Sequence, residues 1–251
     1  MSSAARPVAP APGHGGSASL GAPEYWWYVA RTDLLRTILE ERIGEATLML
    51  DVGSADGPSV GWLTAPQKIS LDLDPRGLRP PEGVCGSVLA LPFADDSFEV
   101  VGAFDVVEHC DPENVALGEL RRVLRPGGRL LLSVPAYQWA WSDHDVANGH
   151  VRRYTRPRAV SAVAGAGFEV LRATYGFTAV FPAFVAERAV RTVRHRRVPA
   201  RDGEPADVVD VPPVGPRLER LLLGLCRWDR RLLARHDLPF GSSVFLAAVK
   251  R

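Results

Sequence analysis

The sequence predicts an α/β fold in which helices cover both faces of a doubly wound, mostly parallel sheet. Short apolar runs alternate with helical segments along residues 47–135. Most of these runs are apolar at every position, which is typical of strands that are buried on both faces. The first run ends in the stretch LMLDVGSADG, where an aspartate and small residues follow directly. A strand that passes into such a turn presents backbone N–H groups to a ligand, so a binding site is expected there.

The N-terminal helix is predicted over residues 24–42, where apolar residues recur at helical spacing and Gly44 follows as a stop signal. Its aromatic first turn, which includes Tyr25 and Trp26, either packs on the core or covers a ligand as a lid. Strands are expected at 47–52, 68–73, 84–88, 98–106, 129–135, 168–175 and 242–249. Helices are expected near 59–64, 112–124, 157–166 and 217–235, with a short turn near 76–80.

Composition favours one domain that acts on small molecules. The chain has 251 residues and a net charge of +1, so it lacks the basic excess that is typical of a nucleic-acid-binding protein. Residues 1–23 contain no continuous apolar stretch, and we expect a disordered tail and not a signal peptide. Residues 24–251 are expected to form a single domain, with a lid helix at 24–44 and substrate-side inserts at 136–158 and 176–240.

The cysteines and the hydropathy pattern predict a cytoplasmic location. Cys85, Cys110 and Cys226 are far apart and form no CxxC motif, so they indicate neither a disulfide framework nor a zinc knuckle. No stretch is apolar over the roughly 18–20 residues that a membrane-spanning helix needs. The protein is therefore expected to be soluble, or at most attached weakly to a membrane surface.

Five sequence blocks, in this order, closely resemble class I S-adenosylmethionine (SAM)-dependent methyltransferases: DVGSADG, LDLDP, LPFADDSFEVV, FDVVEH and RVLRPGGRLLLSVP. The nearest group is the small ubiquinone/menaquinone-type branch, and the resemblance is continuous from about residue 25 to residue 174. It implies a Rossmann-like sheet with an antiparallel last strand, and SAM as the cofactor. It also implies direct in-line transfer of a methyl group to an acceptor, for which no metal is required.

The resemblance implies a cofactor site along the strand ends. Gly53 and Gly57 let the backbone approach the methionine part of SAM, and N–H groups of the turn face its carboxylate. Asp51 suits the ammonium group of SAM, or fixes the turn. Asp72 is the acid expected to accept both ribose hydroxyls, because its two oxygens match two vicinal hydroxyls. Further expected contacts are Ser54, Leu73, Ser87, Val88, Leu89, Phe104 and Asp105, although Ser87 stands where the family often has an acid and the apolar residues are equally suited to the core.

The stretch WSDHDVANGHVRRYTR, after the fifth strand, admits three interpretations. Its polar residues either cap and fasten the following helix, or serve the reaction. In the second case His144 or His150 acts as general base with Asp145 orienting the imidazole, while Arg152 or Arg153 grips an anionic acceptor. In the third, His144, Asp145 and His150 bind a metal. Their spacing matches no familiar metal motif, so we expect no metal.

Four more residues are assigned to the acceptor side. His109, at the tip of the fourth strand, is a catalytic candidate, or a residue that only starts a helix. Tyr154, together with Tyr25 and Trp26, is expected to line the acceptor site.

Three functions are compared. The first is methyl transfer from SAM to a small-molecule acceptor, with anionic and lipid-linked compounds left open and with no DNA substrate. The second is SAM binding without methyl transfer, and the third is a nicotinamide-dependent oxidoreductase. The third is disfavoured because the turn glycines read GxxxG and not GxGxxG, and because no Tyr-x-x-x-Lys pair is present. An arginine-rich segment at 187–201 forms either a solvated face or a weak contact with anionic lipid, and the sequence does not give the oligomeric state.

Overall fold

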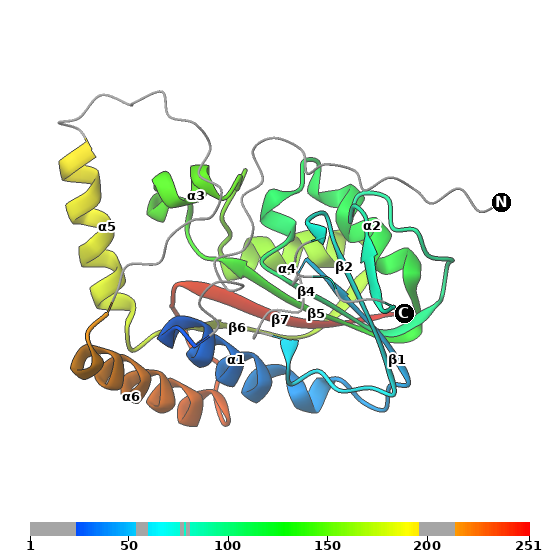
Figure 1. The fold of residues 1–251 in the computed structure, drawn as a ribbon, viewed down its shortest axis with the longest axis horizontal. Coiled ribbons are helices and arrows are strands. Elements are labelled where there is room, and N and C mark those ends of the chain that lie inside the picture. Colours follow the sequence, from blue (N-terminus) through cyan, green and yellow to red (C-terminus); the bar gives the residue numbers. More distant parts are fainter. Residues whose placement is uncertain (1–23, 54–59, 76–77, 79–80, 196–213) are drawn as a thin grey trace.

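The computed structural model describes residues 24–53, 60–75, 78, 81–195 and 214–251. Its centre is a seven-stranded sheet with the strand order β3-β2-β1-β4-β5-β7-β6 (Figure 1). The strands are β1 (Leu48–Val52), β2 (Gln67–Asp72), β3 (Gly83–Cys85), β4 (Phe98–Phe104), β5 (Leu124–Pro135), β6 (Phe168–Gly176) and β7 (Ser243–Lys250). β7 is antiparallel to both of its neighbours, β5 and β6, whereas the other pairs are parallel. The predicted fold class is confirmed.

Helices cover both faces of the sheet. α1 (Trp26–Leu39) and α6 (Pro216–Leu233) pack on one face, and α2 (Glu113–Val123) and α4 (Arg156–Gly165) pack on the other (Figure 1). α3 (Asp143–Ala147) and α5 (Phe181–His195) lie beyond one end of the strands. Short 3-10 turns are η1 (Glu40–Arg42), η4 (Val107–His109) and η5 (Gln138–Ala140).

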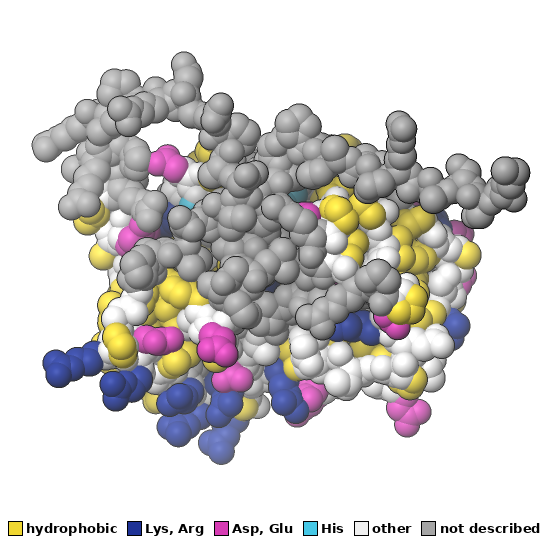
Figure 2. Space-filling model, in the orientation of Figure 1, with side chains coloured by type: hydrophobic (Ala, Val, Ile, Leu, Met, Phe, Trp, Pro, Cys, Tyr) yellow, Lys and Arg dark blue, Asp and Glu magenta, His cyan; other side chains and the backbone are white. Residues whose placement is uncertain are grey.

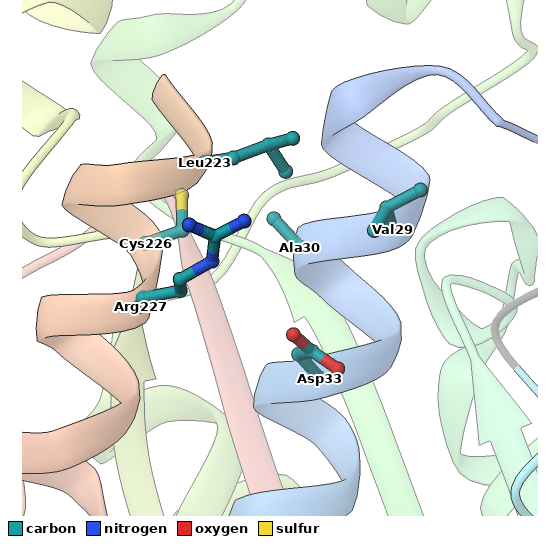
Figure 3. Close-up of a pocket in the computed structure, with 6 residues that line it drawn as sticks. All are labelled: Val29, Ala30, Asp33, Leu223, Cys226 and Arg227. Carbon is teal, nitrogen blue, oxygen red and sulfur yellow. The ribbon is translucent and has the colours of Figure 1, made fainter. Parts of the chain in front are cut away.

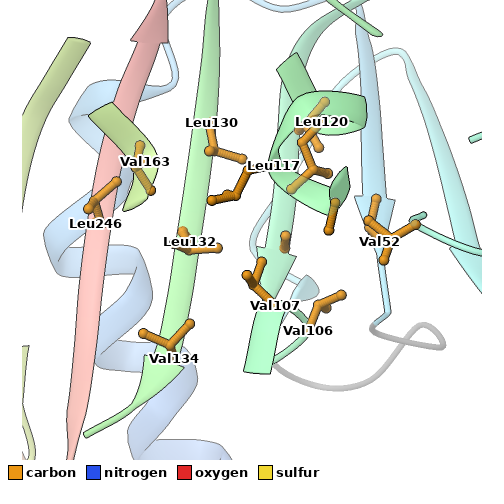
Figure 4. Packing of buried hydrophobic residues seen from close by; sticks show 14 of the residues in the cluster. Val52, Val106, Val107, Leu117, Leu120, Leu130, Leu132, Val134, Val163 and Leu246 are labelled. Carbon is orange, nitrogen blue, oxygen red and sulfur yellow. The ribbon is translucent and has the colours of Figure 1, made fainter. Parts of the chain in front are cut away.

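Two hydrophobic clusters explain why the strands are apolar throughout. Leu130 and Leu132 of β5 point to the α2 and α4 side, where they join Leu117 and Val163 (Figure 4). Leu131, between them, points to the opposite face and packs in the cluster under α1 and α6. Since successive side chains of a strand alternate between the faces, a strand covered on both sides must be apolar at every position.

Three parts of the structure differ from the predicted elements. β5 begins at Leu124 and not at 129, because the ladder jumps from Phe98↔Leu124 to Val100↔Arg129 and the intervening Pro-Gly-Gly segment bulges out. In the segment near 59–64, Val60 belongs to a 3-10 turn, residues 61–62 form a turn and residues 63–64 have no regular structure, whereas residue 59 lies outside the described residues. Gly61 and the nearby Pro66 disfavour the expected helix. α3 and η5 lie in an insert where no element was predicted.

The parallel strands end at one edge of the sheet, which we call the carboxyl edge; it is formed by the ends of β1, β2, β4 and β5. The strand order reverses between β1 and β4. In open α/β sheets, ligands bind at such a reversal, outside the carboxyl ends of the strands. α3 and α5 lie beyond the end of β5, so the segments predicted to form the acceptor side are near this edge (Figure 1).

Candidate active site

The glycine turn after β1 is fixed by backbone geometry. Gly53 has φ of +74°, a region that side-chain-bearing residues rarely adopt, and its N–H donates to the carbonyl of Leu71 at 2.7 Å. A Cβ at this position would overlap Cγ2 of Val106, which follows the end of β4. The turn therefore passes directly against the β4 tip. Ser54 and Gly57, the other predicted turn residues, lie outside the described residues.

The two predicted acids differ in exposure. Asp51 is fully buried (0% exposed) one residue before the end of β1, and pairs in register with Gly102 of β4. Asp72 is the last residue of β2 and is half-buried, and its Oδ1 accepts the N–H of Asp74 at 2.9 Å. Asp72 is therefore the acid of the two that can meet a ligand at the carboxyl edge, whereas Asp51 acts from within the sheet.

The apolar residues predicted around a ligand separate into buried and accessible ones. Val88 is 8% exposed and packs in the core, whereas Leu73 is 54% exposed and Leu89 is 37% exposed. Ser87 forms a tight turn in which its Oγ accepts the N–H of Leu89 at 3.2 Å. Gly86, just before it, donates its N–H to the carbonyl of Asp72 at 2.9 Å, so this turn lies beside the end of β2.

The end of β4 is held by an arginine from the N-terminal helix. Nη2 of Arg31 lies 2.7 Å from Oδ2 of Asp105 and 2.8 Å from Oγ of Ser133, and the Ser133 hydroxyl donates to Oδ1 of Asp105 at 3.0 Å. Asp105 has φ of +57°, and Phe104, which precedes it, is buried in the core. This triangle joins α1 to the ends of β4 and β5. Sequence reasoning found Asp105 but missed Arg31 and Ser133, because no local pattern links residues so far apart.

The aromatic opening of α1 is partly buried. Tyr25 occupies the N-cap, Trp26 packs against the cluster under α1, and the Trp27 ring stacks on Phe177 at 5.7 Å. The guanidinium of Arg31 lies 5.3 Å from the centre of the Trp27 ring. Both roles that the sequence left open, core packing and cover for a ligand, are compatible with this placement.

The insert after β5 brings His150 and Asp145 together. Nδ1 of His150 lies 2.9 Å from Oδ1 of Asp145, which is fully buried. Arg153 forms a bidentate pair with the same carboxylate, through Nε at 2.6 Å and Nη2 at 3.0 Å. Burial alone would raise the pKa of Asp145, but hydrogen bonds from His150 and Arg153 hold this pKa well below its ordinary value. The carboxylate is therefore ionised and accepts the Nδ1–H of His150; in the neutral form of the imidazole, this tautomer has its lone pair on Nε2.

Two residues of η4 meet this pair from the β4 side. The His109 and His150 rings are perpendicular with centres 4.7 Å apart, and Glu108 is fully buried between the β4 tip and the insert. The carbonyl of Glu108 accepts the N–H of Val151 at 2.9 Å, which ties the insert to η4. Burial, together with the charge of Asp105, raises the pKa of Glu108 well above its ordinary value. Sequence reasoning selected His109 and missed Glu108.

Arg152 and Tyr154 fasten the insert to the loop before α2. Nη1 of Arg152 donates to the carbonyl of Cys110, and Nη2 lies 2.8 Å from the carboxylate of Asp111. The Tyr154 hydroxyl donates to Glu113, and the ring is 2% exposed. Burial and the Glu113 carboxylate raise the pKa of Tyr154. These contacts fasten the segment, but to the start of α2 and not to the following helix as the sequence suggested.

His144 lies in α3 and is not part of the pair formed by Asp145 and His150. Ser142 and Asp145 form a capping box at the start of this helix, and Arg188 of α5 donates to the Ser142 hydroxyl. Surrounding protein atoms and the positive charge of Arg188 lower the pKa of His144. Asp145, which was expected to orient either histidine, hydrogen-bonds to His150.

An aromatic wall, which the sequence did not predict, continues from the insert to α5. It consists of Tyr137, Trp139, Tyr175 and Phe181. The Tyr137 ring lies 5.4 Å from Tyr175, 5.6 Å from Trp139 and 5.6 Å from Phe181. Trp139 remains 56% exposed, and burial together with the hydrogen bond to Tyr175 raises the pKa of Tyr137 to about 12.

A small cavity of about 50 Å³ lies elsewhere, between α1 and α6 (Figure 3). It is lined by Val29, Ala30, Asp33, Leu223, Cys226 and Arg227. Sites for small organic ligands usually have volumes of about 300–1,000 Å³, so this cavity is too small for one.

The fold and the ligand-facing carboxyl edge are similar to those of SAM-dependent methyltransferases. Residues 50–132 match the family model described as a methyltransferase domain. This segment contains the ends of β1, β2 and β4, and so most of the expected cofactor contacts. The resemblance stated from the sequence is thus confirmed.

Curated relatives agree with this class. The chain is 35% identical over 142 residues to malonyl-(acyl-carrier protein) O-methyltransferase of Herminiimonas arsenicoxydans, a match covering 49% of this chain and 53% of that protein. It is 31% identical over 121 residues to demethylmenaquinone methyltransferase of Mycobacterium tuberculosis, covering 45% of this chain and 49% of that one. The chain thus spans about half the length of the curated relatives it matches.

Solved structures show the same fold over most of the chain. A SAM-dependent methyltransferase from Thermotoga maritima superposes with a TM-score of 0.56 at 16% identity, covering 93% of this chain and 98% of that one. The (4+2)-cyclase SpnF superposes with a TM-score of 0.54 at 20% identity, covering 89% and 81%. At such identities the likeness concerns the fold alone.

Proposed function

We propose that this protein transfers a methyl group from SAM to a small-molecule acceptor at the carboxyl edge. The observation that carries the proposal is the close approach of the Gly53 turn to the β4 tip, next to the cluster of Glu108, His109 and His150. A cofactor site and a set of proton-transferring groups therefore adjoin at one edge of the sheet. The family match over residues 50–132 supports the same assignment.

The residues of the carboxyl edge fit SAM. At Gly53 a side chain is excluded by the positive φ and by Val106, so bare backbone is available for the methionine part. Asp72 offers carboxylate oxygens to the ribose hydroxyls, with the accessible side chains of Leu73 and Leu89 nearby as apolar cover for the base. When bound, SAM supplies an activated methyl group, so the protein needs only to orient the acceptor and remove its proton.

We assign removal of this proton to the cluster around His150. Asp145 fixes the tautomer and the orientation of the imidazole, and Arg153 keeps Asp145 ionised. Asp145 and Arg153 are thus positioning residues. His144 has no such partner arrangement in the described contacts, and we propose no proton transfer for it.

The acceptor is proposed to have an apolar or aromatic part. The aromatic wall supports this, since Trp139 exposes more than half of its surface on the insert that carries His150. Donors of Arg152 and Arg153 already bind protein carbonyls and carboxylates, so the described contacts favour an apolar acceptor over one gripped by these two arginines. Lipid-linked and aromatic compounds are therefore the first acceptors to test.

SAM binding without methyl transfer is the second candidate. One observation favours it: a cyclase has the same overall fold, so the fold alone does not define the reaction. The two candidates differ in one measurable product, the methylated acceptor. A nicotinamide-dependent oxidoreductase ranks third, and binding of a nicotinamide cofactor without binding of SAM would favour it.

A contact with anionic membrane surfaces is proposed for α6. Among the described residues, no helix is both long and apolar enough to cross a bilayer. α6, however, exposes Leu218, Leu221 and Trp228 together with a series of arginines, and basic side chains gather at the lower left of Figure 2, where α6 lies in Figure 1. An exposed helix face with aromatic, apolar and basic residues suits the lipid interface. The arginine-rich segment first considered for this role lies partly outside the described residues.

The test of the function is transfer of labelled methyl from SAM to a panel of lipid-linked and aromatic acceptors and to cell extract, with mass spectrometry of the product. We expect a product that gains one methyl group and that forms more slowly at limiting SAM with the Asp72→Asn variant. Tight SAM binding without any methylated product would favour the second candidate. Failure to bind SAM at all would overturn both.

A further inference from the structure

Three side chains that could bind a metal ion, from two segments distant in the sequence, meet at the carboxyl edge. Glu108 and His109 belong to η4, and His150 follows α3 roughly 40 residues later. Their potential ligand atoms all lie within 4.8 Å of one another. Ligand atoms at about 2.0–2.2 Å around a tetrahedral Zn²⁺ lie roughly 3.3–3.6 Å apart, so side-chain movements of about 1 Å would bring these three around a single ion.

Glu108 provides an independent observation that points to a cation. Its side chain is 0% exposed, and among the described residues neither carboxylate oxygen has a hydrogen-bond partner. A buried carboxyl group without partners is costly, and it is retained where it pairs with a charge or coordinates a metal. The nearby guanidinium groups of Arg31 and Arg153 pair instead with Asp105 and Asp145.

The contacts around His150 are those of a metal ligand that is held in place. Metal-binding histidines usually donate their second ring N–H to a carboxylate or carbonyl, which fixes the tautomer. Here Nδ1 is engaged by Asp145 at 2.9 Å, and Asp145 is itself held by Arg153 and by the N–H of Ser142 at 2.8 Å. Nε2 is left as the nitrogen that can bind an ion. An ion bound there would occupy the lone pair proposed above for proton removal, so His150 would act as the base only in the ion-free protein.

We infer that Glu108, His109 and His150 bind one divalent transition-metal ion, with Zn²⁺ as the best match. Two imidazole nitrogens and one carboxylate oxygen form a ligand set that proteins use for Zn²⁺ and for Fe²⁺. Three protein ligands leave a further coordination position for water or for an oxygen of a small molecule. This site goes beyond the proposed methyl transfer, for which no metal was expected from the sequence. It also differs from the grouping of His144, Asp145 and His150, because Asp145 binds His150 and Arg153 and so supports the ion indirectly.

The inference is tested by titrating Zn²⁺ into the tag-free, EDTA-treated full chain in a calorimeter and by counting bound metal after dialysis. We expect one ion per chain. His109→Gln, His150→Gln and Glu108→Gln should each weaken the binding at least about tenfold. Asp145→Asn, which leaves all three ligands in place but removes the charge that holds His150 and Arg153, should weaken it by about 10- to 100-fold. His236→Gln, an exposed histidine after α6, is the matched control and should bind Zn²⁺ as the wild type does.

Thermal melting and SAM affinity are measured for every variant, so that loss of folding is separated from loss of the ion. Glu108→Gln keeps the shape of the buried side chain, and it decides the question if a histidine variant does not fold. Wild-type protein that retains no Zn²⁺, or binds it equally well after all three ligand substitutions, overturns the inference. The measured quantity is metal binding, so a negative result would not contradict the proposed methyl transfer. Conversely, a protein that binds the metal but transfers no methyl group would not contradict this inference.

Discussion

Nδ1 of His150 lies 2.9 Å from Oδ1 of Asp145, at the point where the insert after β5 reaches the tip of β4. This pair lies where the insert after β5, which has no regular sequence pattern, meets the parallel sheet. Arg153 binds the same carboxylate, so the orientation of the imidazole depends on buried contacts and not on solvent.

Replacing His150 by Gln should lower the turnover of methyl transfer by about 10²–10⁴-fold, the usual contribution of a group that removes a proton in the transition state. SAM affinity should change little, because His150 belongs to the insert and not to the strand ends. Turnover at saturating SAM and calorimetric SAM affinity are the measurements. His144→Gln is the comparison within the same insert, and an equally large loss of turnover in that variant would contradict the assignment.

Replacing Asp72 by Asn should weaken SAM binding by about tenfold or more, because one of two charged acceptors for the ribose hydroxyls becomes a donor. Asn keeps an oxygen that can accept the N–H of Asp74, so the local turn should survive. Glu41→Gln, which removes an exposed carboxylate from η1, is the charge-matched control. Unchanged calorimetric affinity in Asp72→Asn would show that the ribose site lies elsewhere.

Gly53→Ala should destabilise the fold by about 1–3 kcal/mol through backbone strain and overlap with Val106. Gly44 is a matched control, because it has a similar φ of +72° and a Cβ added there would meet no heavy atom within 4 Å. Gly44→Ala should therefore cost only the strain. Urea unfolding measures both. In a double-mutant cycle, Gly53→Ala made in a Val106→Ala background should cost only about as much as Gly44→Ala, because the overlap is then relieved. Equal losses at the two glycines would mean that the contact with Val106 is unimportant.

Among the three cysteines, Cys85 alone should react with iodoacetamide in the folded protein. Cys85 is exposed, whereas Cys110 and Cys226 are buried. Burial, with the nearby Glu108, raises the pKa of Cys110 to about 11, and burial with Asp229 raises the pKa of Cys226 to about 12. Since raised pKa values favour the neutral thiol, at pH 8 only roughly a thousandth of Cys110 is thiolate. Mass spectrometry should find one modification in the native chain and three after denaturation.

Vesicle sedimentation tests the membrane contact of α6. Binding to anionic vesicles should exceed binding to neutral ones and should fall as salt is added, because exposed charges are screened. Trp228→Ser together with Leu221→Ser should reduce binding by about tenfold or more, since both side chains are more than half exposed. Trp139→Ser removes an exposed tryptophan from the insert and should bind vesicles normally. Equal binding to neutral and anionic vesicles would speak against the contact.

The fold could be predicted because its signals are local. Each strand covered on both faces is a continuous apolar run, as Leu130, Leu131 and Leu132 show by packing on alternating faces. The residues proposed for the cofactor have the same kind of local signal, since Gly53 and Asp72 lie at the ends of such runs. Near 59–64, the predicted helix is wrong for residues 61–64, where a glycine and a proline outweigh the apolar spacing.

The acceptor side was less predictable, because its contacts join distant segments. From the sequence, Arg31 is only one polar residue of an amphipathic helix. Its contacts with Asp105 and Ser133 can be seen only in the folded chain. Glu108 stands next to His109 in a motif, but its burial depends on an insert that begins after β5. The sequence indicated Asp145, His144 and His150 as candidates. The structure shows that His150 is the histidine that hydrogen-bonds to Asp145.

The tether between Val151 and the carbonyl of Glu108 makes the insert a module with fixed ends. A protein engineer who wants another acceptor could exchange the exposed Trp139 and its neighbours 140–141. Gln138, whose Oε1 accepts the N–H of Arg153 at 3.0 Å, would be retained as an attachment point together with Ser142, Asp145 and the segment 150–154. Such grafts would vary the shape above the strand ends without disturbing the groups beneath it.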